Sequence, residues 1–175
     1  MKYRLILIIF LTTFYSANAQ LKVKIGDAIS LNLPAGTYYF YDKAEVEKYL
    51  ENFSITKASA ELLIGEKYKK DNLTFNLRPV RFISKDIKTV EDRFIDNAKQ
   101  DFAEKGAPFE SQRLTIGDNS FVIANYTKGD KVEFAFRGNN IKSGHAFYII
   151  MSGPQADKVK MKSIVDDIIK SVVIK

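Results

Sequence analysis

The sequence holds one histidine, His145, and no cysteine, which leaves few kinds of catalytic or metal site open to it. A zinc site built from several histidines, an HExxH helix and thiol chemistry all need side chains that are absent. His145 could serve a Ser-His-Asp system, yet no G-x-S-x-G element is present to expose a serine nucleophile. The histidine follows Gly144 at the start of an apolar segment, where a structural imidazole is the commoner arrangement. We keep His145 as a candidate binding residue.

The acidic residues form no recognisable catalytic pair. Asp166 and Asp167 are adjacent within a predicted helix, as are Glu91 and Asp92, so their side chains diverge. A dyad of distant carboxylates, as in glycosidases, stays open. No phosphate-binding GxGxxG or GxxxxGK[ST] loop occurs. The sequence therefore predicts no catalytic residue, no metal site and no cofactor.

Two further groups of residues could bind a ligand or a partner. Tyr38, Tyr39 and Tyr41 form an aromatic cluster just before a predicted helix, where they could stack on a ligand or pack into the core. Arg78 and Arg81 flank Pro79 and form a candidate basic pair, although surface arginines are common. These five residues and His145 are the candidate binding residues.

The first half of the chain reads as short strands around one helix. Residues 21–25 and 29–33 alternate apolar and polar side chains, as half-exposed strands do. Asp42 and Glu45 form a capping box that begins a helix over residues 43–52. Residues 62–64 read as strand and 67–72 as an exposed turn. In the strand that follows, the apolar parity switches at Pro79, which predicts a bulge at residues 78–79.

The second half alternates one helix, a run of strands and a closing helix. A helix beginning near Thr89 carries an apolar stripe that includes Phe94 and Ala98. Strands over 109–116, 121–127 and 131–137 follow, the last ending in a loop at 138–140. Residues 121–127 and 145–151 are apolar on both faces, which predicts central strands covered on each side. The expected fold is α+β: an α/β/α sandwich with a central antiparallel sheet and helices on both faces.

The N-terminus reads as an export signal. Residues 1–19 contain a basic start with Lys2 and Arg4, an apolar core and an A-x-A site at 17–19. The apolar run is shorter than the roughly 20 residues that a membrane span needs. No cysteine is present to carry a lipid. We expect residues 20–175 to form a single exported domain, periplasmic or extracellular, soluble and not a lipoprotein.

The charge of the chain is mildly basic. The 27 Lys and Arg exceed the 21 Asp and Glu by six, and two of the basic residues lie in the leader, which leaves +4. This balance permits weak attraction to anionic envelope polymers but does not indicate nucleic-acid binding.

The order of elements resembles the PsbP-like family of exported proteins. The similarity lies in an N-terminal hairpin with the LPAG element at 33–36, a middle helix, a meander of strands, the strand HAFYIIMSG and a closing helix that ends in IIKS. The resemblance implies an α/β/α sandwich and a non-enzymatic domain that binds or assembles with another envelope protein. Residues 26–50 are also similar to the start of a membrane-anchored bacterial family of unknown function.

Three functions remain open from the sequence. The leading hypothesis is an exported, non-enzymatic interaction or assembly-assisting module. A small-ligand or glycan-binding protein or hydrolase is the alternative, because the tyrosine cluster lies near basic residues. A periplasmic inhibitor or immunity protein would share the features of the first.

Overall fold

A computed structural model describes residues 19–80, 86–102 and 106–175. Residues 1–18 of the predicted leader and the candidate residue Arg81 lie outside the described residues. In the part that is described, no helix is long and apolar enough to cross a membrane.

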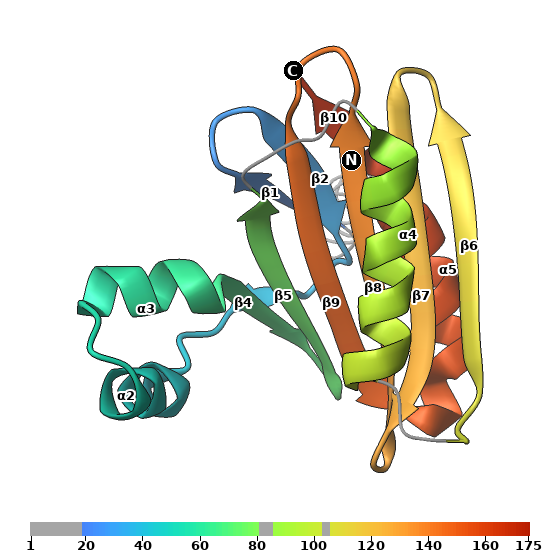
Figure 1. The fold of residues 1–175 in the computed structure, drawn as a ribbon. Helices are drawn as coiled ribbons and strands as arrows, with labels where there is room; N and C mark the ends of the chain where they lie inside the picture. The colour runs from blue at the N-terminus through green and yellow to red at the C-terminus, as the bar shows by residue number, and fades with distance from the viewer. Residues whose placement is uncertain (1–18, 81–85, 103–105) are drawn as a thin grey trace, which may run out of the picture.

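Seven antiparallel strands form the main sheet, in the spatial order β3-β4-β5-β9-β8-β7-β6 (Figure 1). Their bounds are β3 Tyr38–Tyr39, β4 Glu66–Lys70, β5 Leu73–Val80, β6 Phe109–Ile116, β7 Asn119–Lys128, β8 Lys131–Asn140 and β9 Ala146–Pro154. A smaller sheet has the order β1-β2-β10, from β1 Leu21–Ile25, β2 Ile29–Leu33 and β10 Val173–Ile174. The chain thus makes a meander from β6 to β9, as the sequence predicted.

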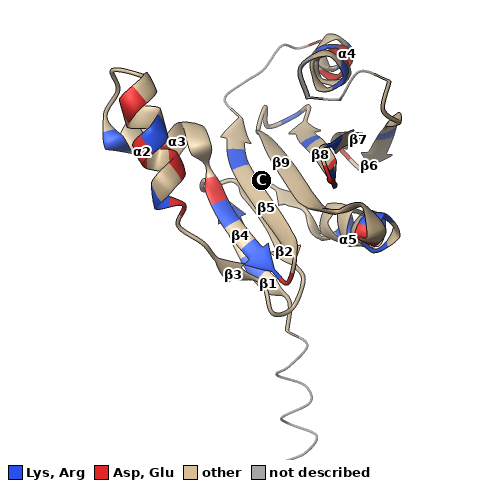
Figure 2. Ribbon diagram, turned by 90° about the horizontal axis from the view of Figure 1, so that it is seen from below, with Lys and Arg blue, Asp and Glu red and all other residues tan. Residues whose placement is uncertain are grey.

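Helices lie on both faces of the main sheet. Helix α4 (Ile87–Asn97), continued by a π-helical turn over Ala98–Phe102, covers β7 and β8 on the side that faces the viewer in Figure 1. A 3-10 turn (Gln155–Asp157) leads into α5 (Lys158–Ser171), which lies on the opposite face together with the small sheet, as Figure 2 shows. This arrangement confirms the predicted α+β sandwich.

The main core lies between the sheet and α5. Phe75, Phe136 and Phe147 on the strands are fully buried, as are Met161 and Ile168 on α5. The closing helix therefore seals the core, because its apolar stripe meets the apolar face of the central strands. A smaller cluster under α4 is built around Tyr126 and three alanines.

Helices α2 (Lys43–Asn52) and α3 (Lys57–Ile64) project from the edge of the sheet (Figure 1). We call these two helices the arm. They pack on each other through Val46, Ala60 and Ile64, a cluster separate from the main core. The bounds of α2 match the prediction, and Asp42 caps it by accepting a hydrogen bond from Glu45 N at 3.1 Å.

Two predictions beside the arm were wrong. Residues 62–64 are not a strand but the end of α3, which begins where Thr56 Oγ1 accepts from Ser59 N at 3.2 Å. Residues 67–70 are not a turn but most of β4, where buried Tyr68 alternates with Lys67 and Lys69 on the other face. Strand β4 was not predicted because its sequence is mostly charged and only one of its side chains is buried.

Two predictions about strand ends were also wrong. No bulge occurs at residues 78–79, because the pairing of β5 with β9 continues without a break to Val80. Pro79 is tolerated because β4 pairs only as far as Leu77, so this part of β5 has a neighbour on one side alone. Strand β8 also continues through residues 138–140, where a loop was expected. Gly138 is needed there, since a Cβ would lie 2.3 Å from the Phe147 ring.

Candidate functional site

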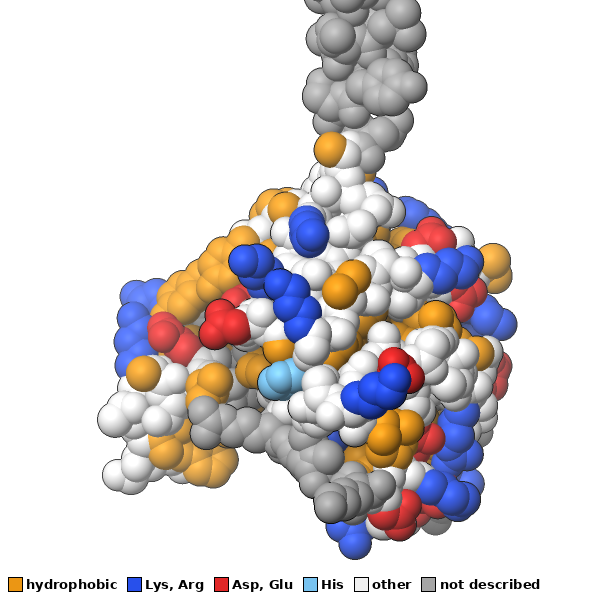
Figure 3. Space-filling model, turned by 90° about the horizontal axis from the view of Figure 1, so that it is seen from above, with side chains coloured by type: hydrophobic (Ala, Val, Ile, Leu, Met, Phe, Trp, Pro, Cys, Tyr) orange, Lys and Arg blue, Asp and Glu red, His pale blue; other side chains and the backbone are white. Residues whose placement is uncertain are grey.

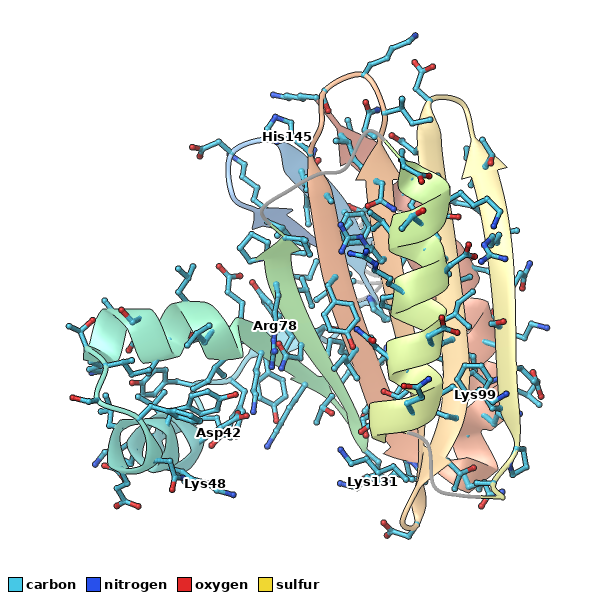
Figure 4. The ribbon with its side chains drawn as sticks, in the orientation of Figure 1. Asp42, Lys48, Arg78, Lys99, Lys131 and His145 are labelled. Atoms are coloured by element: carbon cyan, nitrogen blue, oxygen red, sulfur yellow. The ribbon has the colours of Figure 1, made fainter. Side chains whose placement is uncertain are left out.

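The described candidate residues do not form one site. Tyr39 and Tyr41 line a groove between the arm and the edge of the main sheet, whereas Arg78 lies in a groove on the open part of that sheet. Figure 4 shows Arg78 between the arm and α4, and His145 at the upper end of the molecule. Tyr38 lies on β3 and is 56% exposed.

Ion pairs hold the arm against β4. Lys67 Nζ lies 2.9 Å from Asp42 Oδ2, and it also contacts Glu45. The hydrogen bond from Lys67 is the main reason that the pKa of Asp42 lies below its usual range, and burial opposes it. For Lys67, burial works to lower the pKa, but the bonds to Glu45 and Asp42 outweigh it and raise the pKa overall.

Arg78 and Gly65 fix the other end of the arm. Arg78 Nε donates to the carbonyl of Ile64 at 2.8 Å and thereby satisfies a terminal carbonyl of α3. Gly65 has φ +81°, and a Cβ there would lie 2.5 Å from the carbonyl oxygen of Leu77. The guanidinium of Arg78 therefore already has a structural role, whatever else it contacts.

The groove between the arm and the edge of the main sheet, which we call the arm groove, has a volume of about 420 Å³. Exposed Tyr39, Tyr41 and Leu62 form its rim, and Leu77 and Pro79 belong to its sheet side. Leu62 is 61% exposed and Tyr39 is 56% exposed, high values for side chains of this size. The size of the groove falls within the range of about 300–1,000 Å³ that is typical of ligand pockets.

Carboxylates surround the aromatic rim. Tyr41 donates its hydroxyl to Glu61 Oε1 at 3.0 Å, and Tyr68 donates to Glu66 Oε2 at 2.7 Å. Lys57 lies near the Tyr41 ring, 5.7 Å from its centroid, and 3.8 Å from Glu61. Within the described residues, Glu66 has no cationic partner. The arm groove therefore combines an apolar interior with an acidic edge.

The groove on the open sheet face is larger, about 590 Å³, and more polar. Its floor includes Asn76 and Arg78 from β5 and Tyr148 from β9, with Glu133 beyond them. Burial raises the pKa of Tyr148 to about 12, while nearby Arg78 acts to lower it. Tyr148 also packs edge-on against Phe94 of α4, at 5.6 Å between ring centroids. This groove holds charges of both signs.

Sequence reasoning missed the residues that shape the arm groove. Leu62 was assigned to a strand, where its exposure could not be foreseen, and Glu61 and Glu66 were not singled out. The Thr56-to-Ser59 cap before an apolar run was a usable signal for α3. No group of three or more His, Asp or Glu able to hold a metal ion occurs among the residues that the structure describes.

Comparison with solved structures identifies the fold. Cyanobacterial PsbP (CyanoP) from Synechocystis sp. PCC 6803 matches with a TM-score of 0.56 and 12% identity, over 91% of this chain and 94% of that chain. LpqN of Mycobacterium tuberculosis matches with a TM-score of 0.50 and 12% identity, over 90% of this chain and 91% of that one. No family model and no curated protein matches by sequence. The chain therefore has a PsbP-like fold, as the order of elements predicted.

Proposed function

We propose that this PsbP-like domain is an exported, non-enzymatic interaction module of the bacterial cell envelope that binds a partner protein through the arm groove. The observation that carries the proposal is the exposed aromatic and aliphatic rim of that groove, formed by Tyr39, Tyr41 and Leu62. Tyrosines supply large contact area with a polar end, and they are enriched where proteins bind one another.

The charges at the groove select the kind of partner segment. Glu61 and Glu66 lie beside the apolar interior. Asp42 is paired with Lys67 and Glu61 with Lys57, so Glu66 is the carboxylate left to attract a cation. A segment that inserts one apolar or aromatic side chain and carries a neighbouring Lys or Arg would match both features. The partner that we propose is therefore an envelope protein with an exposed segment of this composition.

The compartment is part of the same proposal. The residue pattern of positions 1–19 supports export, and the absence of cysteine fits a protein that is neither disulfide-bonded nor lipid-anchored. LpqN, which shares the fold, is described as involved in cell envelope biogenesis. A periplasmic inhibitor or immunity protein would belong to the same class of interaction module, and the identity of the partner decides between the two.

Site-specific photo-cross-linking in the cells of origin tests the proposal. A benzophenone amino acid replaces Leu62, and the control replaces Val159, which is 85% exposed. Val159 belongs to α5, a helix that lies away from the arm (Figure 2). We expect an adduct from position 62 alone, whose cross-linked peptide contains an apolar residue beside Lys or Arg. Glu66→Lys should weaken that adduct, and Glu47→Lys on the exposed face of α2 should not. Equal adducts at both positions, or none, would overturn the proposal.

A further inference from the structure

A separate hollow of about 290 Å³ lies at the end of the main sheet, between the start of α4 and the loop that joins β8 to β9. We call it the terminal pocket. Ile87 and Val90 of α4 and Ala146 of β9 line it with apolar groups, and Arg137, Asn139 and His145 add polar ones. Figure 3 looks down on this end of the molecule and shows the single histidine at the surface.

Asn139 presents a buried donor that has no partner. Arg137 Nε donates to Asn139 Oδ1 at 2.8 Å, and because Nε carries a hydrogen it can only donate. This contact fixes the amide orientation with Oδ1 toward Arg137, and the Nδ2 group takes no part in it. Asn139 is 6% exposed, and its Nδ2 finds no hydrogen-bond acceptor within the described residues. Buried N–H groups nearly always have a partner, so this donor is available to an acceptor from outside the chain.

Arg137 supplies charge beside that donor. The two residues are separated by one position on β8 and both line the pocket. Burial lowers the pKa of Arg137 and nearby Glu91 acts to raise it, but an arginine stays charged in either case. Apart from the bond to Asn139, the guanidinium has no hydrogen bond within the described part of the chain. Its remaining N–H groups are free to bind an acceptor.

The neighbouring carboxylates are already engaged by other groups. Glu91 is 5% exposed, accepts a hydrogen bond from Ser120 and forms an ion pair with Arg113, whose Nε lies 3.3 Å away. Asp118 binds Lys142 at 2.8 Å on the exposed loop. Among the described residues that line the terminal pocket there is no Asp or Glu. The described lining of the pocket therefore offers donors and positive charge without a carboxylate of its own.

We propose that the terminal pocket binds a small molecule that carries one carboxylate on an apolar body. The carboxylate accepts from Arg137 and from Asn139 Nδ2, and the body lies against Ile87, Val90 and Ala146. An arginine fork beside an amide N–H suits the two oxygens of a planar carboxylate. One guanidinium near the charge of Glu91 favours a single negative charge over the double charge of a phosphate. His145 lies on the exposed side, where a second polar group of the ligand would meet it.

Calorimetric titration of the purified protein with octanoate tests this inference. We expect saturable binding of octanoate, none of octylamine, and no competition by inorganic phosphate. Asn139→Asp keeps the acceptor for Arg137 but replaces the free donor with a negative charge, so it should weaken octanoate binding at least tenfold. Gln112→Glu makes the same chemical change on the exposed strand β6 and should leave binding unchanged.

A second readout covers the case in which Asn139→Asp fails to fold. In the unmodified protein, the side-chain amide NMR signal of Asn139 should shift as octanoate is added, together with backbone signals of Ile87 and Ala146. Octylamine binding as well as octanoate would show an apolar hollow only, and effective competition by phosphate would show a general anion site. Either result would overturn the inference. So would octanoate binding that is as tight in Asn139→Asp as in the unmodified protein, or that leaves the Asn139 amide signal unshifted. None of these outcomes depends on the arm groove.

Discussion

Lys67 on β4 lies 2.9 Å from the carboxylate of Asp42, the residue that caps α2, and so joins the main sheet to the arm. The side chains of Lys67 and Asp42 are 21% and 29% exposed, which makes this pair better shielded than a surface salt bridge. Since the arm has only a small apolar cluster of its own, this pair and the hydrogen bond from Arg78 to Ile64 help to hold the arm groove in shape.

Replacing Lys67 with methionine should loosen the arm without unfolding the domain. Partly buried hydrogen bonds between charged groups contribute about 1.5–3 kcal/mol, so backbone amides of α2 should exchange with deuterium at least about tenfold faster. The amides of β8 and β9 should exchange as before, because the main core does not include Lys67. Lys43→Met, which breaks only an exposed pair with Glu47, is the control and should change neither region. Unchanged exchange in α2 would show that the arm is held by other contacts.

The same pair predicts how the arm responds to pH. The pKa of Asp42 is lowered in the folded protein, so its contribution is complete above 3.8 and is lost as pH falls through the lower folded value. The pKa of Lys67 is raised, so its contribution is present below 10.5 and is lost as pH rises through the higher folded value. The amide exchange rate in α2, corrected for intrinsic rates, should therefore not change with pH near neutrality and should rise at strongly acidic and strongly basic pH. In Asp42→Asn the acid rise should shrink, and an undiminished rise would assign it to another group.

Gly65→Ala should destabilise the protein more than an alanine at another left-handed glycine. Gly65 and Gly117 both have positive φ, but only at Gly65 would the added Cβ meet backbone, 2.5 Å from the Leu77 carbonyl oxygen. We expect Gly117→Ala to cost about 1 kcal/mol of unfolding free energy and Gly65→Ala about 2–3 kcal/mol. Urea unfolding measures both. Equal losses would mean that the chain beside Gly65 relaxes freely.

Ile168→Asp should unfold the domain, since it would bury an unpaired charge between α5 and the sheet. Ile168 is 1% exposed, and the expected loss is about 4 kcal/mol or more. Val159→Asp on the same helix is the matched control, because Val159 is 85% exposed. Thermal unfolding, monitored by circular dichroism, distinguishes the two variants. A cooperative transition near the unmodified temperature in Ile168→Asp would show that α5 is peripheral to the core.

Periodicity predicted the elements whose burial is one-sided or complete. Helix α2 and the closing helix α5 have long apolar stripes, and β7 and β9 are apolar on both faces, so their sequences specify their surroundings. Strand β4 was missed because it buries only Tyr68 among charged residues. It forms a strand because it pairs with β5, and this pairing leaves no apolar pattern in the sequence of β4.

The residues of the terminal pocket could not be brought together from local sequence patterns, for a similar reason. The sequence Gly138-Asn139-Asn140 has the composition of a loop, and it was predicted as one. In the fold, pairing with β7 and β9 extends β8 through these residues and places Asn139 beside Arg137. Arg137 and Asn139 therefore line the same pocket as His145 because β8 extends through residues 138–140, which their composition did not predict.

Leu62 and Leu63 allow the arm groove to be tested by adjacent substitutions. Both side chains are more than half exposed on α3, but only Leu62 lines the groove. Removing an apolar contact from an interface costs about 1–2 kcal/mol of binding free energy, so Leu62→Ala should weaken the partner interaction roughly tenfold. Leu63→Ala should leave it within about twofold, and neither change should lower the unfolding temperature because neither residue is buried. The affinities are measured with the partner peptide identified by cross-linking at position 62. Equal losses from both leucines would place the contact on the outer surface of α3 instead of in the groove.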